Sequence, residues 1–203
     1  MKIIEETGCE KVNIIAHSKG GLDARYAISQ LGLGPYVASL TTVNTPHRGC
    51  HYADFLLDHI ASPIQTFVAD KYNRTFTKLG DEHPDFLAGV NDLTARNCEE
   101  FNRTVPDVPG VYYQSVTSVM KNFFSAGFPL NAGYLLAKHF DGENDGLVEV
   151  SSAKWGNFLG VMKTGKKGVS HGDVIDLTRQ DIKGYRVCEF YVGLVKDLKE
   201  RGF

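Results

Sequence analysis

The chain of 203 residues lacks long apolar runs, an apolar leader and an excess of positive charge. No run approaches the roughly 20 consecutive apolar residues of a transmembrane helix, so we expect no membrane-spanning segment. Residues 1–10 lack the apolar core of a secretory signal peptide. Because 22 basic residues stand against 24 acidic ones, the net charge is −2, and no cationic field for a phosphate backbone is expected. Nucleic acid is therefore excluded from the expected partners.

Cysteine is scarce, and its four positions lie far apart: Cys9, Cys50, Cys98 and Cys188. No C-x-x-C pair occurs and no histidine stands at metal-ligand spacing from a cysteine, so neither a zinc site nor a redox motif is expected. We expect four buried free thiols. Two long-range disulfides are the alternative.

The composition that remains is typical of one globular domain. Hydrophobic residues make up 42% of the chain and the mean hydropathy is −0.20, which argues against disorder. The β-branched run Lys11–His17 predicts a strand buried on both faces, and Gly20–Leu31 predicts a helix. Tyr36–Val43 predicts a second strand, closed by the polar residues and proline at 44–46. These three elements make one parallel βαβ unit.

The segment 50–109 is expected to be a helical insert, with helices around Tyr52–Ile60 and Pro84–Leu93 and no strand. Its apolar face would be a candidate lid over a substrate cleft, although an ordinary packed helix fits the same pattern. The residues of that face are Phe55, Leu56, Leu57 and Ile60.

Strand character returns at Gly110–Val119 and Phe158–Met162, with a helix through Leu136 between them and a strand-like run at Leu147–Val150. The fold class is therefore α/β, with a mainly parallel sheet and flanking helices. Arg186–Lys199 closes the chain as an amphipathic helix. Its predicted apolar side comprises Cys188, Tyr191, Val192, Leu194, Val195 and Leu198.

The sequence AHSKGG at 16–21 stands where the first strand turns into the first helix. It matches the nucleophile elbow G-x-S-x-G, with Ala16 in place of the first glycine, and small residues suit its close backbone contacts. The context predicts Ser18 as a nucleophile, while a chance serine in such a turn is the alternative. The amide of Lys19, at the helix N-terminus, would stabilise an oxyanion.

A nucleophilic serine needs a hydrogen-bonded histidine, and that histidine needs an acid behind it. His171 is the candidate base, because it lies in a glycine-rich loop after the last strand and keeps the chain order serine, acid, histidine. His17 flanks the nucleophile and is not expected to reach it. For the acid, the residues leave Asp145, Asp141 and Glu143 open.

Three segments, AHSKGGLDARY, VNTPHRG and NDGLV, occur in the order found in bacterial triacylglycerol lipases of the α/β-hydrolase fold, which this chain resembles. The resemblance implies Ser18 as nucleophile, Asp145 as the acid and His171 as general base. It implies hydrolysis of acylglycerols through an acyl-enzyme, a lipid or small ester as substrate, transient contact with a lipid interface and secretion. No cofactor is implied for the chemistry.

The resemblance also suggests three further features. Asp173 corresponds to a calcium ligand in part of the family, but Leu177 replaces a glutamine ligand, so a turn or cap role is the alternative. Thr45–Gly49 would form a wall of the cleft or a plain turn. Phe123–Leu130 would line an acyl pocket or belong to the core.

In this fold four strands precede the elbow, whereas only ten residues precede Lys11 here. We therefore expect the chain to be the C-terminal two-thirds of a lipase, without its N-terminal strands. Lys11–His17 would then be an exposed apolar edge. Loss of a second oxyanion donor would lower turnover by about a hundred- to a thousandfold. The alternatives are a small-ester esterase or acyltransferase, and an inactive remnant or binding module.

Overall fold

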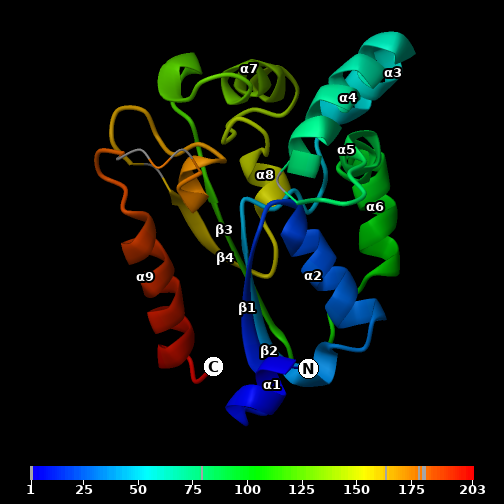
Figure 1. Ribbon diagram of the computed structural model, residues 1–203. Coiled ribbons are helices and arrows are strands. Elements are labelled where there is room, and N and C mark those ends of the chain that lie inside the picture. The colour runs from blue at the N-terminus through cyan, green and yellow to red at the C-terminus, as the bar shows by residue number, and fades with distance from the viewer. Residues whose placement is uncertain (1, 79, 163, 178, 180–181) are drawn as a thin grey trace.

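The computed structural model describes residues 2–78, 80–162, 164–177, 179 and 182–203. Its centre is a four-stranded parallel sheet in the order β1-β2-β3-β4, flanked by helices on both faces (Figure 1). This confirms the predicted α/β class. The strands are β1 (Val12–His17), β2 (Val37–Val43), β3 (Tyr112–Ser118) and β4 (Asn157–Met162).

Helix α2 (Lys19–Gln30) connects β1 to β2 and packs on one face of the sheet, so the predicted βαβ unit is confirmed. Ile28 of α2 meets Leu40 and Tyr113 from the sheet in a buried cluster. Before β1 the chain forms the short helix α1 (Lys2–Thr7), and η1 (Gly34–Tyr36) leads into β2.

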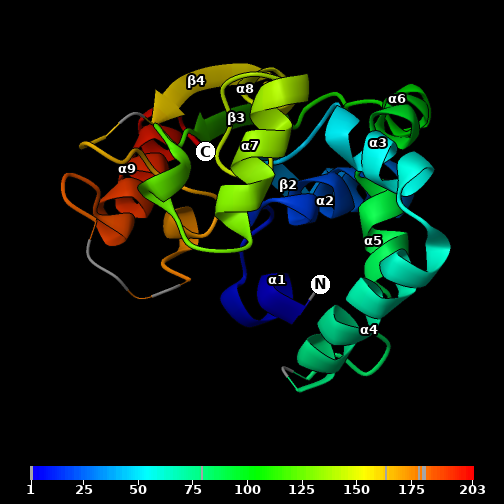
Figure 2. The same cartoon turned by 90° about the horizontal axis from the view of Figure 1, so that it is seen from above.

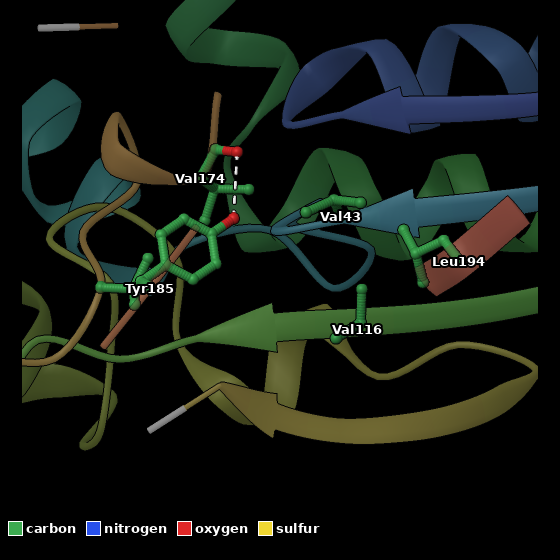
Figure 3. Close-up of a cluster of buried hydrophobic side chains, with 6 residues drawn as sticks. Val43, Val116, Val174, Tyr185 and Leu194 are labelled. Atoms are coloured by element: carbon green, nitrogen blue, oxygen red, sulfur yellow. Dashed lines mark hydrogen bonds between the residues drawn. The ribbon is translucent and has the colours of Figure 1, made fainter. Parts of the chain in front are cut away.

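Helix α9 (Val187–Glu200) covers the opposite face (Figures 1 and 3). Leu194 packs with Val43 and Val116 of the sheet, and the Tyr185 hydroxyl donates a hydrogen bond of 3.2 Å to the carbonyl of Val174. The predicted apolar side of this helix is only partly right. Leu194 and Leu198 are buried. The part of the helix surface that faces the sheet is narrow, so three residues of the predicted apolar side are exposed: Cys188, Val192 and Val195.

Residues 50–109 contain four helices and no named strand in the part that the structure describes. Two of them match the predicted helices, and two were not predicted. The third and fourth helices each begin after a capping side chain. Asp85 accepts a hydrogen bond from Ala88 N at 2.9 Å, and Thr94 accepts one from Asn97 N at 3.4 Å. The helices are α3 (His51–His59), α4 (Ser62–Lys78), α5 (Phe86–Asp92) and α6 (Ala95–Thr104).

The strand-like run Leu147–Val150 is not a strand. It belongs to a loop after α7 (Leu130–Phe140) and leads into α8 (Val150–Ala153), because the amides of Leu147 and Val148 donate to a carboxylate instead of a neighbouring strand. Two short 3₁₀ helices complete the fold: η2 (Phe123–Ser125) and η3 (Asp173–Ile175).

Strand β1 lies at one edge of the sheet that the described strands form. Because β2 is its one neighbour in that sheet, five of its six residues are half-buried and Asn13 is exposed. Side chains of β1 pack on both faces of the sheet, with Ile15 on one face and Ile14 on the other, but the strand is not fully buried. Its place at the edge of the described sheet is the one expected for a chain without the N-terminal strands. The cysteines are free, as expected, but only Cys50 and Cys98 are buried.

The carboxyl ends of the strands are held together by polar side chains. Asn44, with a positive φ of 51°, follows β2 and donates a hydrogen bond of 2.8 Å to Ser118 Oγ, while Ser118 N donates to Asn44 Oδ1 at 2.9 Å. Both residues are fully buried. This pair fixes the ends of β2 and β3 at the edge where the loops that follow the strands meet (Figure 2).

Arg25 is a buried cation that joins α2 to the end of the insert. It donates to Asn102 Oδ1 at 2.8 Å and to the carbonyl of Val105 at 3.1 Å, and its guanidinium lies 3.6 Å from the ring centroid of Trp155. Burial lowers the pKa of Arg25 to about 10, so the side chain stays charged at neutral pH.

We expect Arg25→Ala to lower the free energy of unfolding by about 3 kcal/mol, because it removes both hydrogen bonds and the packing on Trp155 and leaves a cavity. Urea denaturation measures the change. Arg103→Ala is the matched control, since its ion pair with Glu100 is exposed and screened by solvent, so its loss should change the unfolding free energy little. Equal losses in the two variants would contradict a stabilising role for the buried cation.

Candidate active site

Ser18 occupies the sharp turn between β1 and α2. Its backbone has φ 56° and ψ −137°, a region that non-glycine residues rarely adopt. The amide of Ser18 donates to the carbonyl of Val43 at 2.9 Å, so the strand pairing extends to this residue. The strand, strained turn and helix match the predicted nucleophile elbow.

Close packing against Thr45 explains why the motif has glycine at Gly21. A Cβ atom at this position would lie 2.2 Å from Thr45 Oγ1, whereas at Gly20 nothing lies within 4 Å. The close approach therefore requires glycine only at Gly21. Thr45 and His47 are buried, and His47 stacks on Trp155 with ring centroids 5.1 Å apart. Their segment packs behind the elbow, as the turn alternative predicts, and does not form an open cleft wall.

The structure brings Ser18, His171 and Asp145 together, although they lie on three different loops. His171 Nε2 is 2.9 Å from Ser18 Oγ, and His171 Nδ1 is 2.7 Å from Asp145 Oδ2. The amide of His171 also donates to the carbonyl of Asp145 at 2.8 Å. The three side chains form one continuous hydrogen-bonded chain, with Ser18 half-buried and the other two buried.

The carboxylate of Asp145 is fixed by the backbone of its own loop. Its Oδ1 accepts hydrogen bonds from Leu147 N at 2.9 Å and Val148 N at 2.7 Å, which leaves Oδ2 for His171. Gly146 has a φ of 106°, a conformation that this tight loop requires and glycine allows. Of the alternative acids, Asp141 pairs with a different histidine and Glu143 is exposed.

Lys19 is the first residue of α2, so its amide has no acceptor within the helix and lies at the positive end of the helix dipole. Its side chain points elsewhere. The ammonium group lies 2.8 Å from Asp23 and 3.4 Å from Asp92 at the end of α5, which ties the elbow to the insert.

His17 has a role that the sequence did not reveal. Its Nε2 lies 3.1 Å from the carbonyl oxygen of His171, and the two rings have centroids 4.5 Å apart. Burial, and after it the neighbouring His171, lower the pKa of His17 from 6.5 to about 4. A neutral His17 therefore donates to the backbone of the His171 loop and positions it.

His17 makes stability depend on pH. The unfolded chain takes up a proton at His17 near pH 6.5, whereas the folded protein does so only near pH 4, so acidification between these values favours unfolding. We expect this residue to account for a loss of up to about 3 kcal/mol in unfolding free energy across that interval. Urea denaturation at several pH values should give a shallower dependence for His17→Gln. Parallel curves for the two proteins would contradict this assignment.

Asp173 lies two residues beyond His171 and shapes its loop. Its Oδ2 accepts a hydrogen bond of 2.9 Å from Ser170 N, which is the turn role named as the alternative. Within the described part of the chain, no group of three ligating His, Cys, Asp or Glu side chains includes Asp173. The residues around it therefore do not assemble a set of carboxylates for calcium, and the calcium site stays a prediction.

The aromatic stretch Phe123–Leu130 is neither core nor an enclosed pocket, since Phe124 and Phe128 are 79% and 84% exposed. A recess of about 270 Å³ instead opens beside Lys19, between the elbow and the insert. It is lined by Lys19, Asp81, Asp85, Phe86, Gly89, Val90 and Leu93.

The chain is similar to known proteins that are named lipases and esterases. It is 31% identical over 218 residues to triacylglycerol lipase 2 of Saccharomyces cerevisiae, covering 100% of this chain and 61% of that protein. Lipase BlEst2 of Bacillus licheniformis in its mature form matches with a TM-score of 0.60 at 24% identity, over 87% of this chain and 64% of that one. The metagenomic carboxyl esterase MGS0156 matches with a TM-score of 0.62 at 19% identity, over 85% and 50%.

No protein-family model matches the sequence. The chain spans less than two thirds of the length of the yeast relative, and the structural matches below 25% identity establish the fold alone. Further relatives that are named triacylglycerol lipase occur in bacteria, among them Pseudomonas fragi. The chain is thus a homologue of the triacylglycerol lipases, with the fold of the α/β-hydrolase lipases and esterases.

Proposed function

We propose that the chain carries the site of a carboxylic ester hydrolase, with Ser18, His171 and Asp145 as its catalytic triad. The observation that carries the proposal is the hydrogen-bonded chain from Ser18 Oγ through both ring nitrogens of His171 to Asp145 Oδ2. The homology to triacylglycerol lipases supports the same chemistry.

We assign one task to each residue of the proposed triad. Ser18 Oγ attacks the carbonyl carbon of the ester while His171 Nε2 takes the hydroxyl proton, and Asp145 stabilises the imidazolium that forms. His171 then gives the proton to the alcohol oxygen as the ester C–O bond breaks, leaving an acyl group on Ser18. Water then attacks the acyl carbon while His171 takes one of its protons. His171 gives this proton to Ser18 Oγ as the bond between Ser18 and the acyl group breaks, which releases the carboxylic acid.

The oxyanion of each tetrahedral intermediate is stabilised by the amide of Lys19. This amide follows the nucleophile directly and begins α2, so both its hydrogen-bond donor and the helix dipole face developing negative charge. The Lys19 side chain takes no part, because its charge is already paired with Asp23 and Asp92.

We propose a lipid or other ester with an apolar acyl chain as substrate. Phe86, Val90 and Leu93 give the recess beside Lys19 an apolar lining. Leu177 is exposed, and its amide donates to the carbonyl of Gly172, the residue that follows His171. Exposed apolar side chains near the triad suit transient contact with a lipid interface. In the described part of the chain, no helix has the length and apolar character to cross a membrane.

The insert 50–109 is proposed to be a lid. Its helix α5 borders the recess. The ion pair of 3.4 Å between Lys19 and Asp92 holds this helix to the elbow, as expected of a closed lid. Because the side chains of Lys19 and Asp92 are 38% and 57% exposed, solvent screens this contact, and it is weak enough to open.

Hydrolysis of p-nitrophenyl butyrate and of emulsified trioctanoin by the full chain tests the function. A lipase should hydrolyse both, with the rate rising when trioctanoin passes from solution to emulsion. Hydrolysis of the soluble ester alone would assign a small-ester esterase. A correctly folded chain that hydrolyses neither, at any pH from 6 to 9, would overturn the proposal.

A further inference from the structure

A second group of polar side chains lies outside the triad, where the insert meets the loop that carries Asp145. His51 is the first residue of α3, Asp141 follows the last residue of α7 and Glu149 precedes α8. One potential metal-ligating atom from each of the three lies within 4.8 Å of the other two.

Asp141 is the member whose surroundings favour a bound cation. Its side chain is only 2% exposed, and its Oδ1 lies 2.6 Å from His51 Nδ1. Its Oδ2 is buried and has no hydrogen-bond partner among the described residues. Burial of a carboxylate oxygen without a hydrogen-bond partner costs free energy of folding. A cation bound to Asp141 Oδ2 would offset this cost.

Glu149 adds a second buried carboxylate to the group, and its Oε1 accepts a hydrogen bond from the Ser151 hydroxyl. Two neighbouring carboxylates in a buried place repel each other. A divalent cation between them would neutralise that charge. His51 closes the group from the outside, with a side chain that is 64% exposed.

We propose that His51, Asp141 and Glu149 bind a divalent transition-metal ion of the zinc class. One imidazole nitrogen and two carboxylate oxygens are ligands that zinc prefers, whereas calcium would take oxygen alone. Ligand atoms of a tetrahedral zinc site lie about 3.3 Å apart, so modest side-chain rotations from the observed arrangement suffice. Exposure of His51 leaves the fourth position to water.

The location gives the ion a structural task. Asp141 stands four residues before Asp145, and Glu149 stands four residues after it. An isolated β-bridge between Asn144 and Glu149 closes the loop that carries Asp145. His51 belongs to the insert. A bound ion would therefore clamp the loop of Asp145 to the first helix of the insert, at a place separate from Asp173.

Zinc titration of the full chain, stripped of metal by chelation and dialysis, tests the site by calorimetry and thermal unfolding. We expect one Zn²⁺ per chain and a rise in Tm that saturates with zinc. His51→Ala and Asp141→Asn should each weaken zinc binding by at least about tenfold. Neither readout needs ester hydrolysis, so failure of this proposal is distinguishable from failure of the triad.

His59→Ala is the matched control, because His59 is an exposed histidine at the other end of α3. It should bind zinc as the wild type does. Absence of zinc binding, or equal weakening in His51→Ala and His59→Ala, would overturn the site. If Asp141→Asn does not fold, as circular dichroism would reveal, the exposed His51 decides the outcome alone.

Discussion

Replacement of Ser18 by alanine is expected to lower kcat for ester hydrolysis by about 10⁵-fold, which leaves only the residual rate that substrate binding and the Lys19 amide provide. The variant lacks the oxygen that lies 2.9 Å from His171 Nε2, so no acyl-enzyme forms. Alanine removes one atom from a half-buried position, so the fold should persist. Initial rates with p-nitrophenyl butyrate, normalised to folded protein, measure the effect.

Ser62→Ala provides the control for this experiment, since Ser62 is an exposed serine at the start of α4, in the insert. It should hydrolyse the ester at the wild-type rate. If Ser18→Ala keeps more than about a tenth of the wild-type kcat, Ser18 is not the nucleophile and the proposed mechanism is wrong.

Asp145→Asn should lower kcat by about 10⁴-fold with little change in KM. The amides of Leu147 and Val148 donate to Oδ1, so the asparagine oxygen takes that position and its NH₂ group faces His171 Nδ1. Nδ1 must then accept, which places the ring proton on Nε2. In that tautomer His171 cannot take the proton of Ser18.

This argument predicts a pH signature as well as a rate. Hydroxide can replace the blocked base, so the residual activity of Asp145→Asn should rise with pH beyond the range in which the wild type levels off. Asp197→Asn, in a partly exposed ion pair on α9, is the control and should keep the wild-type rate and profile. A loss of less than about tenfold in Asp145→Asn would show that another group orients His171.

The parts of the fold that were predicted from sequence are those that local patterns determine. The β-branched run before Ser18 and the helical segment after it predict a parallel βαβ unit, and the structure contains it. Of the two missed helices, α6 is polar and begins at the capping side chain of Thr94, and α4 packs against α5 within the insert. The incomplete burial of β1 does not follow from its own residues, because burial depends on neighbouring strands; the edge position follows from how few residues precede the elbow.

The same distinction holds for the candidate site. The elbow motif and the chain order point to Ser18 and His171, and the resemblance to lipases selects Asp145 from three acids. The role of His17 could not be predicted, because its partner carbonyl is 154 residues away. The cluster of His51, Asp141 and Glu149 has no short-range spacing either, so only the fold reveals it.

The central claim is that Ser18 is a nucleophile activated by His171. Reaction of the full chain with a fluorophosphonate, followed by peptide mass spectrometry, tests it most directly, because the reagent forms a stable bond only with an activated serine. We predict one phosphonyl group per chain, attached to Ser18, and strongly reduced labelling in Asp145→Asn. Folded protein that remains unlabelled, or is labelled at another serine, would contradict the claim.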